Sequence, residues 1–492
     1  MVARAAAAAR GLRIPARDAV PLAAPADARG RRSLIEGLDM EELRIVAVNG
    51  MLGYGYEFSS LDNGVAQAPD LMGVDAGSTD PGPYYLGAGQ SLVRDAQVRR
   101  DLSYALRKAR EAGVPLVIGS AGMGGGNPHL ALVRGLLLEE ARAHGLHFKL
   151  ATIASEIDRQ VVLDALRAGA IRPMPDVGEL SESAVSGSVR IVGQMGTEPL
   201  AHALAQGADV VLAGRACDTA IYAALPIARG YDPGLALHMA KIMECGAQCA
   251  LPLAPNDCLL GTIRRDHFLI RPLAPHRVVS PESVAAHTMY EQSHPLMLYE
   301  PEGDVDMSEA RFEQVDRQTV RVSGSRFLPA RRLTVKLEGA RSLGFRAFTV
   351  AGIRDRTVIE NLPVIEEAVR AAVRRNLGVD VDESGYALDF RVYGRDGVLG
   401  ALEPERHRVP HEVGLLIEVV ARTQELASHV LSLARSSTLH CPFPGRKTTA
   451  GNLAFPFSPS DVAAGEVFEF SVYHLMDTPD PLALFPVHME TV

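Results

Sequence analysis

The amino-acid sequence predicts an α/β fold whose first domain has a parallel sheet and whose second, smaller domain is α+β. Short apolar runs alternate with segments of helical spacing from residue 43 to about residue 250, which is typical of βαβ units in a sheet covered on both faces. From about residue 259 the runs become richer in Val, Ile, Thr and Phe, and only two helical segments separate them. The first domain therefore fits a Rossmann or flavodoxin-like arrangement, and the second a mixed or antiparallel sheet with helices on one face.

In the first domain, each predicted strand is an apolar run bounded by glycine or polar residues. These strands cover residues 43–48, 70–77, 114–120, 147–153, 189–194 and 208–214. The predicted helices at 98–113 and 131–145 each end in a glycine, which readily adopts the left-handed conformation that terminates a helix. The alternation of such strands and helices indicates a parallel sheet.

The second domain is predicted from β-rich runs separated by turns. Its strands lie within residues 259–273, 318–327, 331–340, 345–353, 387–394 and 414–421, and its helices within 361–378 and 422–437. A Pro- and Gly-rich segment follows near the C-terminus. We expect a disordered tail at 1–38, the α/β domain at 39–258 and the α+β domain at 259–492.

The first 33 residues are rich in Ala and Arg and contain two acidic residues. This composition fits a mitochondrial transit peptide. It fits equally a disordered tail or an upstream start codon in a GC-rich genome, and we favour this second interpretation. An apolar segment of the signal-peptide type is missing from this stretch, so secretion is not expected.

Composition excludes several classes of protein. Apolar residues make up 47% and charged residues 22% of the 492 residues, as in a globular protein too long for one ordinary core. A net charge of −9 argues against nucleic-acid binding, because phosphate contacts need a basic surface. Apolar runs are too short for a membrane span, and five cysteines without a Cys-x-x-Cys pair are typical of reduced thiols. We therefore expect a cytoplasmic homo-oligomer that binds a small molecule, with no nucleic-acid or membrane partner and no metal site.

A glycine-rich segment, "IGSAGMGGGNPH" at residues 118–129, follows the third predicted strand and opens a helix. Its glycines permit positive φ angles, and the helix that starts near Pro128 presents free N–H groups to an anion. The segment matches neither a Walker A loop nor the GxGxxG dinucleotide fingerprint. A carboxylate or phosphate is the expected guest, and the alternative is a tight turn without a ligand. The candidate anion-binding residues, with Asn127 as the helix cap, are Gly122, Gly124, Gly125, Gly126 and Asn127.

Polar side chains crowd the segment after the second predicted strand, "VDAGSTDPGPYYLGAG". Asp75 directly ends this strand, where α/β enzymes commonly place a general acid or base, and partial desolvation there would raise its pKa toward the working range. Ser78 and Thr79 are expected to contact the substrate. The alternative is that these residues form ordinary turns.

The sixth predicted strand leads into "AGRACDTAIYAALP". Arg215 is expected to bind a substrate carboxylate in a bidentate fork, with Asp218 and Thr219 as helix caps or site residues. Cys217 lies near a helix N-terminus and an arginine, which would lower its pKa, although no histidine adjoins it in the sequence. Glu156 follows the fourth predicted strand in the same way.

Five strand-end loops thus carry polar or glycine-rich residues, and the carboxyl ends of parallel strands meet at one edge of a sheet. This convergence predicts an active site. Arg326, Lys336 and Glu338 lie on predicted strands of the second domain, where alternation aims them toward the cleft. The candidate catalytic residues are Asp75, His129, Glu156 and Asp218.

Several long motifs belong together: "GVDAGSTDPGPYYLGAG", "IGSAGMGGGNPH", "ADVVLAGRACDTAIYAALPIARGYDPGLALHMAKIMECGA" and the closing "AGNLAFPFSPSDV". In these motifs the chain, from about residue 43 to the C-terminus, resembles the acyclic terpene utilisation family, the AtuA-type proteins. The resemblance implies a role in catabolic pathways for geraniol- and citronellol-like acyclic terpenes, encoded near acyl-CoA carboxylation machinery. It implies no agreed set of catalytic residues, so the candidates above rest on the loops.

We therefore expect an enzyme of branched or terpenoid carboxylic acid catabolism, a hydratase, lyase or related acyl-group enzyme. A redox cofactor is not expected, and CoA enters as part of an acyl-CoA substrate. The glycine segment and Arg215 would hold the substrate's carboxylate, thioester or phosphate while Asp75 or Asp218 moves a proton. One alternative is a non-catalytic ligand-binding subunit that works with a small co-encoded partner enzyme. Another is a Mg²⁺-dependent lyase using Asp75, Asp80 and Asp218, because carboxylates suit that ion.

Overall fold

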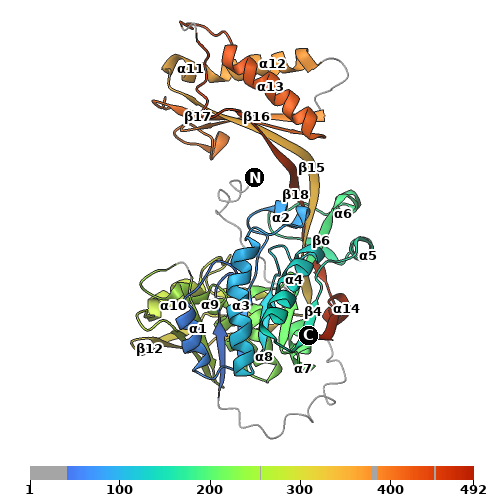
Figure 1. Cartoon of the computed structure of the whole chain (residues 1–492), viewed down its shortest axis with the longest axis vertical. Helices are drawn as coiled ribbons and strands as arrows, with labels where there is room; N and C mark the ends of the chain where they lie inside the picture. The colour runs from blue at the N-terminus through green and yellow to red at the C-terminus, as the bar shows by residue number, and fades with distance from the viewer. Residues whose placement is uncertain (1–41, 255, 378–384, 448–449) are drawn as a thin grey trace, which may run out of the picture. The chain divides into compact units, whose positions relative to one another are not determined.

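The computed structural model describes residues 42–254, 256–377, 385–447 and 450–492, and these form two compact units (Figure 1). The larger unit comprises the described residues up to 341 together with residues 470–492. The smaller unit comprises the described residues from 342 to 469. The tail predicted at 1–38 lies outside the described residues.

Within the described residues, a ten-stranded sheet forms the centre of the larger unit, in the order β12-β13-β9-β8-β1-β2-β3-β7-β4-β19. Five neighbouring strands in it run parallel. They are β1 (Leu43–Ala47), β2 (Leu71–Asp75), β3 (Leu116–Gly119), β7 (Val210–Ala213) and β4 (Lys149–Ile153). The mixed α/β class is thus confirmed. A Rossmann or flavodoxin-like arrangement is not, because the strand order differs from both and antiparallel strands extend the sheet on each side.

Five of the strands beyond residue 258 extend this same sheet. β8 pairs antiparallel with β1, placing Gly261 opposite Ile45. The chain therefore changes from parallel to antiparallel pairing at the predicted domain boundary without leaving the sheet. The antiparallel strands are β8 (Leu259–Ile263), β9 (His267–Pro272), β13 (Thr319–Ser323) and β12 (Arg311–Asp316) on one side and β19 (Val487–Thr491) on the other.

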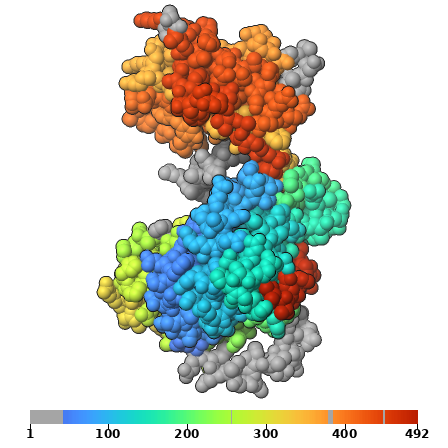
Figure 2. Space-filling model, in the orientation of Figure 1, coloured from blue at the N-terminus to red at the C-terminus, as the bar shows by residue number. Residues whose placement is uncertain are grey.

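Helices cover both faces of this sheet. Alternate strand residues point to opposite faces, so that Ile45 and Val46 belong to two separate apolar clusters. The cluster that contains Val46 is covered by α1 (Phe58–Val65), α3 (Asp95–Ala112) and α4 (Asn127–His144). The cluster that contains Ile45 is covered by α7 (Thr197–Ala205), α8 (Asp218–Ala228) and α9 (Pro233–Met243). Helices α3 and α4 lie side by side, toward the viewer in Figure 1, and their blue and cyan atoms cover the unit in Figure 2.

Helices α3 and α4 end at their C-termini as the sequence predicts, whereas the N-terminus of α4 differs from the prediction. Gly113 and Gly145 cap the two helices with φ angles of +66° and +61°. Asn127, the predicted cap of α4, is instead its first helical residue, because Gly126 takes the cap position. Pro128 lies in the first turn, as predicted.

The chain reverses its course along the sheet between β4 and β7. Strands β1, β2 and β3 follow one another, β4 lies two positions further on, and the chain then returns to β7 between them. The helices before and after the reversal, α4 and α7, consequently pack on opposite faces of the sheet. Such a reversal is where open α/β sheets bind ligands, at the carboxyl ends of the strands.

The strand predicted at 189–194 forms, as β6 (Arg190–Gln194), but it does not join the parallel sheet. It pairs antiparallel with β15 (Thr334–Ile353), with Lys336 opposite Gln194. The larger unit is completed by shorter elements: α2 (Pro83–Ala88), α5 (Arg159–Arg167), β5 (Ile171–Pro173), α6 (Glu182–Gly187), η2 (Gly246–Cys249), α10 (Pro281–Thr288), β10 (Met297–Glu300), β11 (Gly303–Asp306), β14 (Arg326–Pro329), α14 (Pro481–Leu484) and part of β18 (Asp461–Asp477).

The smaller unit has an antiparallel sheet with helices on one face, as the sequence predicts for an α+β segment. Residues 345–353 of β15 pair with β17, which pairs in turn with β16. Its apolar core joins these strands to two helices packed against each other. The elements are α11 (Arg356–Glu360), α12 (Leu362–Leu377), β16 (Tyr386–Tyr393), η4 (Gly400–Leu402), β17 (Val413–Ala421) and α13 (Gln424–His440). Across the described part of both units, none of the helices has the length and apolar character to cross a bilayer.

Candidate active site

Loops from separate strands meet at the carboxyl edge of the parallel strands. The loop after β3 is bonded to the loop after β7, because Ser120 N donates to the Gly214 carbonyl oxygen over 2.9 Å. It is also bonded to the loop after β2, where Met123 N donates to the Ala76 carbonyl oxygen over 3.1 Å. The structure therefore brings together the segments that contain the predicted site residues.

Ser155, in the loop after β4, joins two of these loops. Its hydroxyl donates to the Gly125 carbonyl oxygen over 2.8 Å and accepts from Arg215 N over 2.7 Å. Gly125 has a φ of +69°, and a Cβ atom there would lie 2.1 Å from Arg215 N. Gly125 thus permits the close approach of two loops.

The other predicted glycines also pack against protein atoms. A Cβ atom at Gly126 would lie 2.4 Å from Arg190 Cδ, and one at Gly124 would lie 3.1 Å from Leu86 Cα. A Cβ atom at Gly122 would crowd the backbone of His129. The glycine-rich segment is therefore compact because neighbouring loops fill the space around it.

The N-terminus of α4, predicted to receive a substrate anion, already holds a carboxylate of the protein. Asn127 N donates to Glu156 Oε2 over 2.8 Å, and Arg190 Nε lies 3.2 Å from the same oxygen. This pairing satisfies a free N–H group of the helix and uses the favourable end of its dipole. Glu156 therefore caps α4 in this structure, at the position where a substrate anion was predicted, and its catalytic role stays a prediction.

His129 is fully buried and bonded to backbone oxygens. Its Nε2 lies 2.9 Å from the Tyr85 carbonyl oxygen and 3.2 Å from that of Gln90, and burial lowers its pKa. Ser78 Oγ accepts a hydrogen bond from Asp80 N at 3.3 Å. Through its two contacts His129 positions α2 and the residues that follow it. Ser78 belongs to a turn, and Thr79 is buried in the same turn.

Arg215 is the centre of a buried charge network. Its Nε donates to Glu338 Oε2 over 2.9 Å, and its NH1 donates to Ser120 Oγ over 3.1 Å. Lys336 Nζ lies 2.8 Å from the other Glu338 oxygen. Burial alone would raise the pKa of Glu338, but Arg215 and Lys336 outweigh it and lower this pKa to about 2. The guanidinium thus contacts protein groups through Nε and NH1, and its predicted binding of a substrate carboxylate stays a prediction.

Asp75 and Asp218 form a pair of carboxyl groups beside this network. Asp75 is 5% exposed, whereas 35% of the Asp218 side chain is exposed. Burial raises the pKa of Asp75 well above its usual value, and the charge of Asp218 raises it further, while Arg215 opposes both. Burial also raises the pKa of Asp218, against the opposing effect of Arg215, whose NH1 lies 3.7 Å away. Burial thus raises the pKa of both carboxyl groups, and it raises that of Asp75 well above its usual value.

A second buried ion pair lies on α9, where Lys241 contacts Glu244. Burial lowers the pKa of Lys241, but the Glu244 carboxylate more than offsets this and raises it. The charge of Lys241 in turn lowers the pKa of Asp218. Lys241 thus adds a second cation to the surroundings of the carboxyl pair, and Lys336 adds a third.

Several buried polar atoms of this cluster have no hydrogen-bond partner among the described residues. They include Asp75 Oδ1, Asp218 Oδ1, Thr219 Oγ1 and the hydroxyl of Tyr222, whose side chain is fully buried. Thr219, also predicted for the site, is buried beside Glu300. Buried polar atoms without partners are costly, and they are found where a ligand is bound or a reaction takes place.

Sequence reasoning missed Tyr222, Lys241, Glu244 and Glu300. Tyr222 follows Asp218 by four residues on α8, so helical spacing was the available signal. Lys241 and Glu244 are charges within an otherwise apolar helix, which is a second signal. Glu300 gave no such signal, because only the fold brings β10 to this cluster.

Two other expectations need correction. Burial raises the pKa of Cys217 well above its usual value, so this side chain remains a thiol despite the nearby arginine. Arg326 is exposed and pairs with Asp306 at 2.6 Å, whereas Lys336 and Glu338 on β15 do reach the cluster. Alternation along a strand therefore placed two of these three side chains correctly.

A protein-family model, described as acyclic terpene utilisation family protein AtuA, matches residues 91–252 and 268–457. The chain belongs to the AtuA family. The matched residues contain the glycine-rich segment, the loop with Arg215 and Asp218, and the strand with Lys336 and Glu338. No curated protein and no solved structure matches the chain.

In this AtuA-family protein the described residues contain no group of three or more His, Cys, Asp or Glu side chains placed to hold a metal ion. Of the three acids named for the Mg²⁺ alternative, Asp75 and Asp218 influence each other's surroundings, and the exposed Asp80 also raises the pKa of Asp218.

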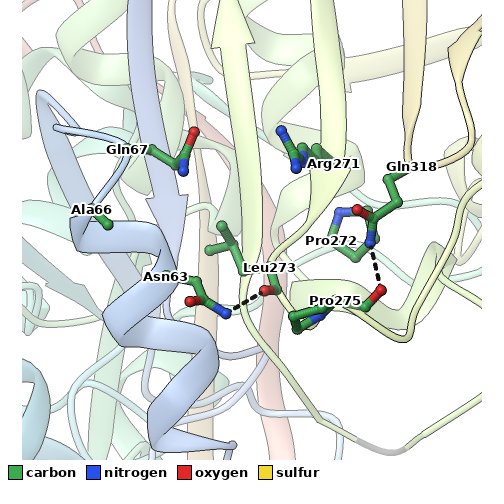
Figure 3. Close-up of a pocket in the computed structure, with 8 residues that line it drawn as sticks. All are labelled: Asn63, Ala66, Gln67, Arg271, Pro272, Leu273, Pro275 and Gln318. Atoms are coloured by element: carbon green, nitrogen blue, oxygen red, sulfur yellow. Dashed lines mark hydrogen bonds between the residues drawn. The ribbon is translucent and has the colours of Figure 1, made fainter.

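A pocket of about 230 Å³ lies elsewhere in the AtuA-family protein, between the end of α1 and the end of β9 (Figure 3). Its dashed bonds join Asn63 to the Leu273 carbonyl oxygen and Gln318 to that of Pro275, each over 3.1 Å. Arg271 is the one charged residue in its lining. The pocket thus lacks the paired acids and bases of the cluster around Asp75, and we assign no reaction to it.

Proposed function

We propose that this AtuA-family protein is an enzyme that breaks down a branched or terpenoid carboxylic acid. It acts on the acid or its CoA thioester as a hydratase or lyase. The observation that carries the proposal is the pair of carboxyl groups at the carboxyl edge of the sheet, with Asp75 buried and Asp218 partly exposed. Family membership supports the substrate class.

Hydration and elimination both need one group that accepts a proton and another that donates one. The ionised Asp218 suits the first role, because it is partly exposed and close to cations. The protonated Asp75 suits the second, because burial keeps its proton at neutral pH. Two acids with environments that push their pKa values apart are thus assigned to opposite roles.

The cations beside the pair favour an anionic substrate. Arg215, Lys241 and Lys336 supply three positive charges, and Glu338, Glu244 and Asp218 lie among them. Partly buried charges are weakly screened, so we expect these cations to contribute to binding of a carboxylate or an acyl-CoA. In an acyl-CoA the CoA moiety is a part of the substrate.

The substrate is identified with a deletion strain grown on branched and terpenoid acids, in which the accumulated metabolite names the compound. Turnover of that compound and its CoA thioester is then measured with purified protein. Asp218→Asn should lower kcat/KM by about 100- to 10,000-fold. Asp70→Asn, an exposed residue just before the same strand that ends at Asp75, is the matched control and should leave it unchanged.

The competing function is a ligand-binding subunit that assists a partner enzyme. Binding of the accumulated metabolite without product, and product only after a co-encoded protein is added, would establish that function instead. Full turnover by Asp218→Asn would remove the carboxyl pair from the mechanism.

A further inference from the structure

We propose that the hydroxyl of Tyr222 and the carboxyl of Asp75 together bind the oxygen of an enolate. The substrate is then a carbonyl compound, such as a thioester or ketone, with a hydrogen on the neighbouring carbon. This inference rests on the proposed function and deepens it, because it names the functional group on which the site acts.

Tyr222 belongs to α8 and Asp75 to β2, two elements that pack against each other. Gly73 and Asp75 are two residues apart on β2 and therefore point to the same face of the sheet. The Tyr222 ring occupies the space above Gly73, where a Cβ atom would lie 2.7 Å from the ring carbon Cε1. A Cβ atom at Gly119, which pairs with Asp75, would lie 3.6 Å from Asp75 Oδ1. Gly73 thus makes room for the Tyr222 ring, whereas the nearest neighbour of a Cβ atom at Gly119 would be Ile221 Cδ1, at 2.4 Å.

Helical geometry directs the Tyr222 hydroxyl toward the carboxyl pair. Asp218 and Tyr222 are four residues apart on α8 and lie on one face of that helix. Long side chains in helices lean toward the N-terminal end, and α8 begins at the edge where Asp75 ends its strand. Burial raises the pKa of Tyr222 well above its usual value, and the nearby acids Asp75 and Asp218 act in the same direction, so the phenol keeps its proton.

Both groups have an unused hydrogen-bonding atom. Asp75 Oδ2 accepts from Gly77 N at 3.2 Å, so the proton of this acid is on Oδ1, which has no partner among the described residues. The Tyr222 hydroxyl likewise has none. The half-buried Tyr56, by contrast, donates to the Asp101 carbonyl oxygen over 2.9 Å. Two donors without acceptors at one point are suited to an oxygen that gains negative charge.

The step balances without a further reactant. The Asp218 carboxylate takes the proton from the carbon next to the carbonyl, and the C–H electron pair forms a carbon–carbon double bond. The carbonyl π electrons move to oxygen, which becomes the enolate oxygen and accepts hydrogen bonds from Tyr222 and Asp75. The enolate can then expel a leaving group from the β-carbon, which is the chemistry of a lyase or dehydrating enzyme.

The first test separates a functional hydroxyl from a structural one. Tyr222→Phe removes a buried group without a partner, so the midpoint of urea unfolding should stay unchanged or rise. Turnover should fall by about 100- to 1,000-fold, as on removal of one oxyanion donor. Tyr56→Phe should show the reverse, a lower midpoint with normal turnover. A lower midpoint for Tyr222→Phe would mean that its hydroxyl has a structural partner and would overturn the proposal.

The second test needs no natural substrate. Acetylacetone is a small 1,3-dicarbonyl whose enolate absorbs at a longer wavelength than its neutral form. The wild-type protein should bind it as the enolate, and Tyr222→Phe should weaken that binding by about tenfold or more. Absence of enolate binding to the wild type, or equal binding to Tyr222→Phe, would overturn the inference. Binding that depends on Tyr222 without turnover of any acid would leave the inference standing and refute the proposed function.

Asp75 is tested with two replacements in the same assay. Asp75→Asn keeps an N–H donor at the position, so it should retain part of the enolate binding. Asp75→Leu keeps the volume without a donor, so it should lose more. Equal loss in the two variants would show that hydrogen-bond donation by residue 75 does not hold the enolate.

Discussion

Arg215 and Glu338 form a hydrogen-bonded ion pair in the interior of the larger unit, with Nε and Oε2 2.9 Å apart and the two side chains 5% and 0% exposed. The pair joins the loop after β7 to a strand that comes more than a hundred residues later. A buried ion pair stabilises a fold little more than apolar side chains of similar size would. Removing one partner, however, leaves the other charge buried without a counter-charge. The site therefore depends on both members being present.

Glu338→Gln should lower the free energy of unfolding by about 3–5 kcal/mol, because it leaves Arg215 buried without its counter-charge. Urea unfolding at neutral pH measures the difference. Glu313→Gln is the matched control, since Glu313 pairs with Arg321 while 55% of its side chain is exposed. Similar losses in the two variants would mean that the buried pair contributes no more than a surface pair.

The same pair predicts how stability changes with pH. The pKa of Glu338 is lowered from 4.5 to about 2 in the fold, so its charge stabilises the protein fully above pH 4.5. That contribution is lost as the pH falls from 4.5 toward 2, where the folded protein takes up the proton as well. The gap in unfolding free energy between wild type and Glu338→Gln should be constant above pH 4.5 and narrow below it. A gap that widens in acid would contradict this assignment.

Gly125→Ala should be far more damaging than Gly145→Ala, although the two glycines have similar φ angles of +69° and +61°. A Cβ atom at Gly145 meets open space, so that variant bears only backbone strain of about 1–2 kcal/mol. At Gly125 the same atom would collide with Arg215 N. Thermal unfolding and soluble yield are measured for both variants. Gly145→Ala reports the effect of backbone strain alone, and Gly125→Ala reports strain together with the collision. Equal melting temperatures would refute the close approach of the loops.

Ser155→Ala should cost about 1–3 kcal/mol of unfolding free energy, because it leaves Arg215 N and the Gly125 carbonyl oxygen buried without their partner. Ser183→Ala, at an exposed serine on α6, should have little effect. Amide hydrogen exchange of Arg215 gives a local readout, since this N–H should exchange faster in Ser155→Ala. Unchanged exchange would show that the serine does not hold the loops.

Local sequence patterns predicted the helices and strands, but they did not predict which strands pair with each other. The runs at 43–48 and 114–120 became β1 and β3, and glycine ended α3 and α4, because burial on both faces and capping act over a few residues. The run at 189–194 looks the same in sequence, yet β6 pairs with β15. Register between strands far apart depends on tertiary contacts that one sequence does not display.

For the candidate site, too, local sequence patterns indicated some residues and not others. Asp75 and Asp218 could be named because each lies directly at the end of a strand or the start of a helix. The cap that Glu156 forms was not predicted, because a carboxylate close to a helix N-terminus in space serves as well as one from a ligand. Tyr222 was missed, since a tyrosine within an apolar helix is usually part of the core.

Asp75 belongs to a strand that is paired on both sides, by β1 and by β3. Amide groups in such a strand open to solvent only when the whole domain unfolds, so the acid is fixed to the least deformable part of the backbone. The surrounding loops can accordingly change in length and composition, and with them the range of molecules admitted, while the proton donor keeps its place.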